Sequence, residues 1–494
     1  MTIGRASKFF KFTIIAFVAL IFLLVATRNN ISQDDGSNDD IFDQVAQEKK
    51  IDKEGTNNNI AALSVTDAPL KEEVTEKTEP PSVKNDELEL ADYEKMPGAF
   101  LKSNLPAPIN QTYCNFNYKL PFELNYSNKD LAFPPQEGEE SQYRVLYNIT
   151  EAYWVKKVPQ VTYCTHMTAN FANFIPELLR RWDGLVTVAA YVPDIDVAFF
   201  LEQINQFCYC EPEMHRVSIH IVTHKLIPFS MQNITFKRPG TCAPLDSAKI
   251  PIYKDYDESS AYQVNIMRNT ARTSALTKYV LVSDIELMPS KNLSKQFLEF
   301  VAKYPKPDPK KVFVVPIFEV EKDYPIPDNK EELLKLLADQ RAVYFHGLVC
   351  AHCQRFPGIE KWLETGYSPQ IKGLLEVKRH DPYHRWEPLF IGTNAEPLYS
   401  ERLSWEGLQD KMTQSLEMCL QNYTYVILDN AFLCHWPGIK REVYKNRFPA
   451  LVEVNQKFFK EIVADFLRHY PNIKECNADF EYNFENPPRG KKKS

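Results

Sequence analysis

The chain has 494 residues, a net charge of −7, 44% hydrophobic residues and 25% charged residues, which is typical of a folded globular protein and not of a disordered or collagen-like one. The charge is uneven, because residues 29–96 contain 18 acidic and 7 basic side chains whereas residues 97–494 are close to neutral. A neutral body lacks the basic surface that phosphate neutralisation requires, so nucleic acid is excluded as a partner.

The N-terminus predicts a membrane anchor at residues 12–28. Its apolar run contains no charged residue as far as Thr27 and approaches the roughly 20 residues that a membrane-crossing helix needs. Basic residues precede the run and acidic residues follow it, so the positive-inside rule leaves residues 1–11 in the cytosol and the rest in the lumen. The alternative is a signal peptide cleaved near Ala26, which changes the attachment but not the compartment.

The segment after the anchor predicts a stem and a lumenal body. Residues 29–96 are acidic, polar and without sustained apolar periodicity, so we expect them to be disordered. Residues 97–494 form the expected lumenal domain, and the ten cysteines all lie beyond residue 113, where they can pair in an oxidising compartment. Sequons for N-glycosylation occur at Asn110, Asn125, Asn148, Asn233, Asn292 and Asn422.

The body alternates predicted strands and helices. In chain order we expect a strand at 160–164, a helix at 167–181, strands at 185–191, 217–222, 279–282 and 312–316, a helix at 331–337 and an amphipathic helix across 451–466. Asp328 and Glu331 resemble a capping box for the second helix. The alternation predicts an α/β fold with a mostly parallel sheet, helices on both faces and ligands at the carboxyl ends of the strands.

Two acids follow the predicted strand at 279–282. Asp284 and Glu286 are separated by one residue, and carboxylates at the end of a strand suit a divalent cation such as Mn²⁺ or Mg²⁺ beside a sugar-nucleotide diphosphate. The alternative for this pair is a solvated strand end.

His435 ends an apolar stretch near the C-terminal part of the body. Its imidazole is a second type of ligand for the same cation. The alternative is a hydrogen-bonded histidine of the core.

Cys350 and Cys353 form a single C-x-x-C with His352 between them. A zinc site would need two further ligands, so a disulfide, between these two or with other cysteines, is the preferred interpretation.

Short blocks in a fixed order resemble glycosyltransferase family 49, whose members include β-1,4-glucuronyltransferases and the C-terminal domains of the LARGE proteins. The Asp284-Ile-Glu286 segment and the Phe432-Leu-Cys-His435 segment belong to this series. The blocks that carry the resemblance are 161–166, 179–184, 268–269, 282–290, 314–319, 329–333, 350–354, 386–390, 400–402 and 431–435. They span most of the body.

The resemblance implies a GT-A fold, a UDP-sugar donor and a Mn²⁺ ion. In that family the metal is held by an Asp-x-Asp motif and a later histidine, which match Asp284, Glu286 and His435; this chain has Glu where the family usually has the second Asp. Better-known members invert the anomeric centre, which requires a carboxylate base. Glu387 is the first candidate for that base and Glu401 the second; the alternative for each is a surface or capping acid.

The resemblance also suggests residues around the donor. Arg268 and Asn269 precede the metal strand by about one helix length and are expected donor contacts, with a salt bridge or helix cap as the alternative. Thr165 and His166, at the end of the first strand, are expected to line the nucleotide pocket. Trp386 is a candidate for stacking on an acceptor sugar, unless it is buried in the core.

The sequence therefore predicts a type II Golgi glycosyltransferase that is Mn²⁺-dependent and inverting. It would transfer a sugar, glucuronate in the first instance, from a UDP-sugar to the terminal sugar of a glycan. UDP-N-acetylglucosamine and UDP-xylose are alternative donors, and a homo-oligomer or a partner transferase is compatible with the sequence. The alternative of a different class is a catalytically weak lumenal protein that binds glycans or assists a transferase.

Overall fold

A computed structural model describes residues 112–116, 123–124, 143–153, 160–224, 234–235, 239–242, 262–305, 308–441, 449–470 and 475–476. The predicted tail, anchor and stem, and the sequons at Asn110, Asn125 and Asn233, lie outside these residues. Within the described part of the chain, no helix combines the length and the apolar character that a membrane crossing requires.

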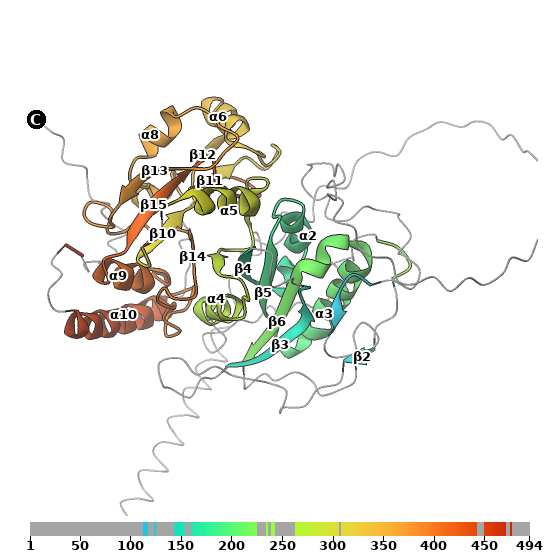
Figure 1. The fold of residues 1–494 in the computed structure, drawn as a ribbon. Coiled ribbons are helices and arrows are strands. Elements are labelled where there is room, and N and C mark those ends of the chain that lie inside the picture. The colour runs from blue at the N-terminus through green and yellow to red at the C-terminus, as the bar shows by residue number, and fades with distance from the viewer. Residues whose placement is uncertain are drawn as a thin grey trace, which may run out of the picture. The chain divides into compact units, whose positions relative to one another are not determined.

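One large sheet organises the described body (Figure 1). In spatial order its strands are β1 (Asn115–Phe116), β3 (Tyr143–Glu151), β6 (Val217–His224), β5 (Leu185–Tyr191), β4 (Val161–Thr168), β8 (Tyr279–Val282), β14 (Phe390–Gly392), β10 (Lys311–Val314), β15 (Thr424–Asp429) and β13 (Lys372–Val377). Strands β6, β5, β4 and β8 are parallel, as are β10 and β15. Strand β14 lies antiparallel between β8 and β10 and joins the two parallel groups.

The expectation of a mostly parallel sheet is therefore wrong, because antiparallel pairs also join β1 to β3, β3 to β6 and β13 to β15. The short strand β14 carries too few residues to show a strand pattern in the sequence. Its antiparallel direction is set by its pairing with both neighbours.

Two smaller sheets accompany the large one. The first has the order β12 (Ala342–Tyr344), β11 (Ile317–Val320), β16 (Leu433–His435) and β9 (Leu287–Pro289). The second pairs β2 (Glu123–Leu124) with β7 (Ile234–Thr235). The first of these sheets brings the segment after the acidic motif beside the segment that carries His435.

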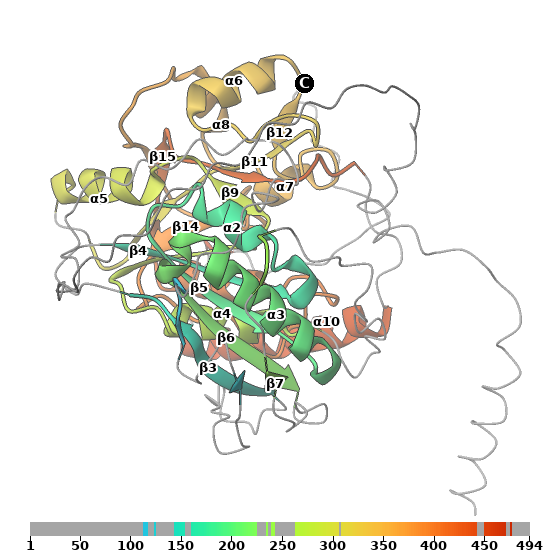
Figure 2. The ribbon, with the colours of Figure 1, turned by 90° about the vertical axis from the view of Figure 1, so that its right-hand side faces the viewer.

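The helices cover both faces of the large sheet, as expected. The helices of the described residues are α2 (Phe174–Leu179), α3 (Asp194–Cys210), α4 (Val264–Thr273), α5 (Leu293–Lys303), α6 (Lys330–Ala338), α7 (Ala351–Gln354), α8 (Ile359–Glu364), α9 (Met412–Leu420) and α10 (Pro449–His469), with 3₁₀ turns η3 (Ala169–Phe171) and η4 (Pro212–Arg216). On β4, Tyr163 packs into the core that includes α3, which lies in front of the strands in Figure 2. The next residue, Cys164, packs against Met267 and Ala271 of α4 on the opposite face. Burial on both faces explains why these strands are continuous apolar runs.

Most expected elements are confirmed, and two details are corrected. The helix expected at 167–181 begins only at Phe174, because β4 continues pairing with β5 as far as Thr168. The helix expected at 331–337 is α6, but its N-cap is Asn329 and not Asp328. The Asn329 side chain accepts a hydrogen bond from the Glu332 N–H at 3.1 Å, and the Glu332 carboxylate accepts from the Asp328 N–H at 2.8 Å.

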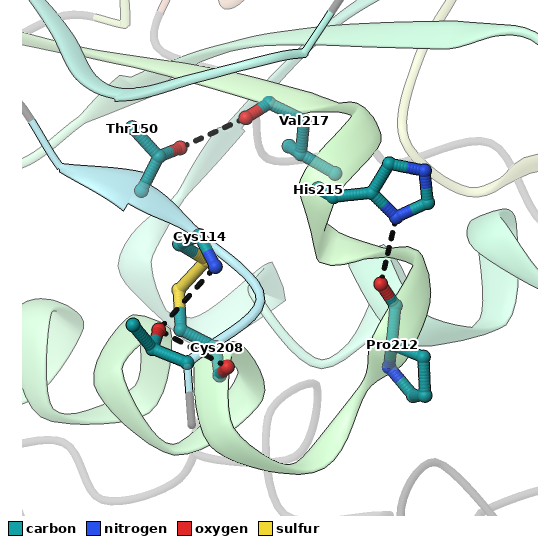
Figure 3. Close-up of a disulfide and its surroundings, with 7 residues drawn as sticks. Cys114, Thr150, Cys208, Pro212, His215 and Val217 are labelled. Carbon is teal, nitrogen blue, oxygen red and sulfur yellow. Dashed lines mark hydrogen bonds between the residues drawn. A yellow bond between two sulfur atoms is a disulfide. The ribbon is translucent and has the colours of Figure 1, made fainter. Parts of the chain in front are cut away.

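Eight of the ten cysteines form disulfides: Cys114–Cys208, Cys210–Cys242, Cys350–Cys353 and Cys419–Cys476. The pairing of Cys350 with Cys353 confirms the disulfide interpretation of that motif. Figure 3 shows the first bond, which ties the segment before β1 to the end of α3. Cys164 and Cys434 are buried free thiols.

Candidate active site

Asp284 lies just beyond the carboxyl end of β8. Strand β8 pairs with β4, and the Ser283 N–H extends this pairing to the Cys164 carbonyl at 2.9 Å. The chain then turns, with the Leu287 N–H donating to the Asp284 carbonyl at 3.1 Å, and enters β9. The Asp284 side chain, 24% exposed, is thus presented at the edge where parallel strands end, which is where such sheets bind ligands.

Three side chains donate to the Asp284 carboxylate. Arg268 Nη2 and His166 Nε2 approach Oδ1 at 3.1 and 3.0 Å, and Lys411 Nζ approaches Oδ2 at 3.2 Å. Burial alone raises the pKa of Asp284, but Lys411, Arg268 and His166 outweigh it and hold this pKa well below its usual range. The carboxylate is therefore ionised at any physiological pH.

His166 is buried against Asp284. Its Nδ1 lies 2.8 Å from the Tyr262 hydroxyl, and burial lowers the pKa of its imidazole despite the Asp284 hydrogen bond. The neutral ring donates through Nε2 to Asp284 and accepts the Tyr262 proton at Nδ1. The preceding residue, Thr165, is fully buried, and its hydroxyl has no hydrogen-bond partner among the described residues.

Arg268 is fastened on two sides. Besides Asp284 it forms an ion pair with Asp410, and its guanidinium lies 5.4 Å from the centroid of the Tyr399 ring. The guanidinium is 2% exposed, so Arg268 positions Asp284 from within the protein.

Asn269 holds the segment after β14. Its Nδ2 donates to the Tyr399 carbonyl at 2.8 Å and to Glu401 Oε1 at 2.9 Å, and its Oδ1 accepts from the Tyr399 N–H at 3.1 Å. Asn269 and Glu401, two residues that the sequence placed in the site, are thus joined to each other, and the Asn269 amide is used in bracing this segment.

Glu286 and His435 are brought together by the pairing of β9 with β16. The Trp436 N–H donates to the Glu286 carbonyl at 3.1 Å, and His435 is in register with Leu287. Burial, assisted by the charge of Asp284, raises the pKa of Glu286 to about 7. His435 Nδ1 lies 3.2 Å from the Gly438 carbonyl, which only accepts, so Nδ1 carries the proton and the Nε2 lone pair is available to a ligand.

Glu319 supports this part of the site, and sequence reasoning missed its role. It is fully buried on β11 in register with His435, and its carboxylate accepts from the backbone N–H groups of His346 and Lys440, both at 3.1 Å. Burial raises the pKa of Glu319, which these two hydrogen bonds and the nearby His435 oppose. Glu319 therefore ties the loop that follows β16 to the turn at His346.

The predicted metal ligands offer a suitable set of atoms. Two carboxylates and the Nε2 of a neutral imidazole fit a divalent cation that also binds phosphate oxygens. Among the described residues, however, only His380, Cys419 and Cys476 bring three potential ligand atoms within 4.8 Å of one another. Those two sulfurs form a disulfide and cannot bind a metal as thiolates. The Asp284, Glu286 and His435 side chains therefore fit the cation in their chemistry and would have to draw closer around it.

The charges of Lys411, Asp410 and Arg268 act on the Glu387 carboxyl. Glu387 precedes β14, is half-buried, and its backbone N–H donates to the Cys353 carbonyl at 3.0 Å. Burial raises the pKa of its carboxyl, while Lys411 opposes this effect. Its neighbour Trp386 is 2% exposed and packs against Tyr425 at 5.6 Å, so the proposed stacking of Trp386 on an acceptor sugar is wrong.

Lys411 was also missed by sequence reasoning. It is the N-cap residue of α9, more than 120 residues after Asp284, and no local motif marks it. It contacts Asp284, and its charge also lowers the pKa of Glu286 and of Glu387 against the effect of burial.

Three of the predicted glycosylation sites fall on described residues. Asn292 and Asn422 are exposed in turns beside α5 and β15, and Asn148 is half-buried in β3. Glycosylation at these positions stays a prediction.

Comparison with known proteins identifies relatives across most of the body. Residues 160–471 match the family described as "Glycosyl-transferase for dystroglycan". Beta-1,4-glucuronyltransferase 1 of Danio rerio is 29% identical over 318 residues, covering 60% of this chain and 72% of the relative. The human protein of the same name is 23% identical, covering 63% and 76%. Human LARGE1, a xylosyl- and glucuronyltransferase, is 23% identical, covering 56% of this chain and 31% of its own length.

Among solved structures, one of GalNAc-T7 with UDP, GalNAc and Mn²⁺ aligns at 10% identity with a TM-score of 0.33, covering 66% of this chain and 53% of that chain. This likeness is too weak to support an argument. The match to the family model is different, because it covers well over half of the chain and includes every element that supplies the candidate site. The chain is therefore a member of glycosyltransferase family 49, the glycosyltransferases for dystroglycan.

Proposed function

We propose that the chain is a type II Golgi enzyme that transfers glucuronate from UDP-glucuronate to the terminal sugar of a glycan, with inversion at the anomeric carbon. The observation that carries this proposal is the Asp284 carboxylate at the carboxyl end of β8, held by Arg268, His166 and Lys411, with Glu286 and His435 joined to it through the pairing of β9 with β16. The choice of glucuronate rests on relatives that are named glucuronyltransferases.

Asp284, Glu286 and His435 Nε2 would hold the divalent cation, Mn²⁺ in the first instance. Bound there, it would neutralise the negative charge that develops on the departing diphosphate. Arg268 and His166 donate to one oxygen of Asp284, and Glu319 holds the loop next to His435. These hydrogen bonds would keep the metal ligands in position.

Glu387 is the proposed base that takes the proton of the acceptor hydroxyl. Its raised pKa brings it closer to the operating pH, where a general base is most effective. Glu401 is the second candidate, but its carboxylate accepts a hydrogen bond from Asn269, which favours a bracing role.

The disulfides support a secretory compartment, because such bonds persist in oxidising surroundings. The predicted anchor at residues 12–28 would hold the enzyme in the Golgi membrane with the body in the lumen. The acceptor would be a glycan carried by a glycoprotein.

A catalytically weak protein that binds glycans or assists a transferase is the second candidate function. The observation that favours it is Glu286, a longer acid than the family's usual Asp, with a pKa raised to about 7. Such a protein would bind UDP without a requirement for Mn²⁺.

The test is a donor screen on the full-length chain in detergent. UDP release would be measured with UDP-glucuronate, UDP-xylose, UDP-N-acetylglucosamine and UDP-glucose, with a panel of glycan acceptors, in Mn²⁺ or EDTA. We expect turnover with UDP-glucuronate that EDTA abolishes. Turnover with another donor would correct the sugar, and UDP binding that ignores Mn²⁺, without turnover, would favour the second candidate.

A further inference from the structure

Lys411 occupies one oxygen of the principal metal ligand. Its side chain is 16% exposed, and its ammonium lies 3.2 Å from Oδ2 of Asp284. The other oxygen, Oδ1, already accepts from Arg268 and His166 at 3.1 and 3.0 Å. A divalent cation that binds Asp284 must therefore approach Oδ2, and it meets the ammonium there.

Lys411 and Arg268 differ in their freedom to leave Asp284. Arg268 is held by Asp410 as well and is packed over Tyr399, so it stays when a cation binds. Lys411 has Asp284 as its one ion-pair partner within 4 Å among the described residues. Its flexible four-carbon stem allows the ammonium to move by several ångströms while the backbone remains in place at the start of α9.

An ammonium displaced from Asp284 needs another anion nearby, because an unpaired charge in a partly buried site is costly. Of the other carboxylates, Asp410 acts on Lys411 but is already paired with Arg268, Glu286 is assigned to the metal, and Glu387 is assigned as the base. The donor supplies the alternative, since its diphosphate and a uronate carboxylate both present anionic oxygens at a cation held by Asp284.

We propose that Lys411 competes with the divalent cation for Oδ2 of Asp284 and, once displaced, binds an anionic oxygen of the UDP-sugar donor. This inference rests on the proposed function. It makes Lys411 the residue that couples the two binding events: metal binding frees the ammonium for the donor, and donor binding keeps the ammonium away from Asp284. Linkage requires that each ligand strengthens the binding of the other by the same factor.

The test uses Lys411→Met, which preserves the length of the side chain and removes its charge. Binding of Mn²⁺ without nucleotide, followed by electron paramagnetic resonance of the free ion, should tighten about tenfold, a usual size for coupled sites. Binding of UDP at saturating Mn²⁺, followed by calorimetry, should weaken by a similar factor. A purely structural role for Lys411 would weaken both, so the opposite signs are diagnostic.

Two controls accompany this variant. Lys411→Arg keeps the charge and should retain the weaker Mn²⁺ binding of the wild type. Lys335→Met removes an ammonium that is 68% exposed on α6 and should change neither affinity. Unchanged or weaker Mn²⁺ binding in a folded Lys411→Met protein would overturn the competition, and unchanged affinity for every nucleotide would overturn the donor contact.

Comparing UDP, UDP-glucose and UDP-glucuronate identifies the anionic oxygen. A loss of affinity already present with UDP assigns Lys411 to the diphosphate, whereas a loss confined to UDP-glucuronate assigns it to the uronate carboxylate. If both affinities change as expected but no donor supports transfer, the inference stands and the proposed function fails. If transfer is normal and Lys411→Met leaves both affinities unchanged, the inference alone fails. Absence of Mn²⁺ binding in both wild type and Lys411→Met, with or without UDP, would overturn both.

Discussion

At the scale of single residues, the candidate site depends on how neighbours set the charge of three acids. Asp284 is kept ionised by three donors, whereas the pKa of Glu286 and of Glu387 is raised by burial. The acids thus differ in environment, and such a difference is what separates a metal ligand from a group that transfers a proton.

Asp284→Asn should abolish transfer while leaving secretion of the body, expressed as residues 97–494, intact. The amide oxygen can still accept from Arg268, but the neutral side chain is a poor metal ligand, and losing several kcal/mol of electrostatic stabilisation corresponds to about a 10³-fold loss of kcat. The measurement is turnover of the body at saturating donor, with the amount of secreted body as the control for folding. Normal turnover in this variant would show that the metal assignment is wrong.

Glu387→Gln should reduce kcat by about 10²- to 10⁴-fold, the usual contribution of a general base. Because burial raises the pKa of Glu387, the wild-type carboxylate becomes protonated at a higher pH than an ordinary glutamate, and activity should fall as the pH is lowered through that value.

The profile of kcat against pH should be recorded at saturating Mn²⁺, where the metal ligands are ionised. The residual activity of Glu387→Gln should lack the acidic limb that the wild type shows. An acidic limb that is identical in both proteins would assign the base to another residue, Glu401 being the next to test.

At the scale of elements, a buried ion pair joins α6 to the large sheet. Lys330 opens α6 and is completely buried, with its ammonium 2.6 Å from both the Trp362 carbonyl and Asp429 Oδ1 and 4.1 Å from the centroid of the Trp362 ring. Asp429 ends β15, and Trp362 lies on α8. Three elements from separate parts of the chain thus meet at one charge.

Lys330→Met should lower the free energy of unfolding by about 3–5 kcal/mol, because it leaves the Asp429 carboxylate buried without its cation. Lys335→Met, on the same helix, removes an exposed i,i+4 pair with Glu331 and should cost less than about 1 kcal/mol. Urea unfolding of the two variants provides the comparison. Equal effects would mean that the buried pair contributes no more than a surface pair.

At the scale of the whole molecule, disulfides fasten the two ends of the described body. Cys114–Cys208 ties the segment before β1 to α3 across a sequence separation of 94, and Cys419–Cys476 ties α9 to the segment beyond α10 across 57. The segment at Cys114 supplies only the short strand β1 to the large sheet, and the segment at Cys476 lies beyond α10. Each disulfide therefore restrains a segment that sheet pairing holds weakly.

Replacing Cys114 and Cys208 together by serine should lower the free energy of unfolding of the body by about 2–4 kcal/mol. Without the bond, the loop between these two residues is no longer restrained in the unfolded chain, whose conformational entropy therefore rises. The measurement is thermal unfolding with and without reductant. Reductant should also destabilise the wild type, and the difference between the two proteins should shrink under reducing conditions. A variant as stable as the wild type in oxidising buffer would contradict this expectation.

The strands β4, β5, β6 and β8 and the long helix α10 could be predicted from the sequence, because continuous apolar runs and regular helical spacing are local signals. The family and the candidate ligands Asp284, Glu286 and His435 could also be inferred from the sequence, because family motifs are short runs of consecutive residues that are visible without the fold. The capping box, in contrast, was displaced by one residue, because Asp328 and Asn329 are both good N-cap residues.

The mixed direction of the sheet and the environment of the acids could not be predicted, because both depend on contacts between distant parts of the chain. Strand β14 is too short to show a pattern, and its direction depends on neighbours that are distant in the chain. Lys411 lies in no local motif, and the block that ends at Glu319 gives no sign of that residue's role, yet Lys411 contacts Asp284 and Glu319 braces the loop beside His435. The physical reason is that electrostatic contacts depend on distance in space, and residues over a hundred positions apart come within hydrogen-bonding distance only when the chain folds.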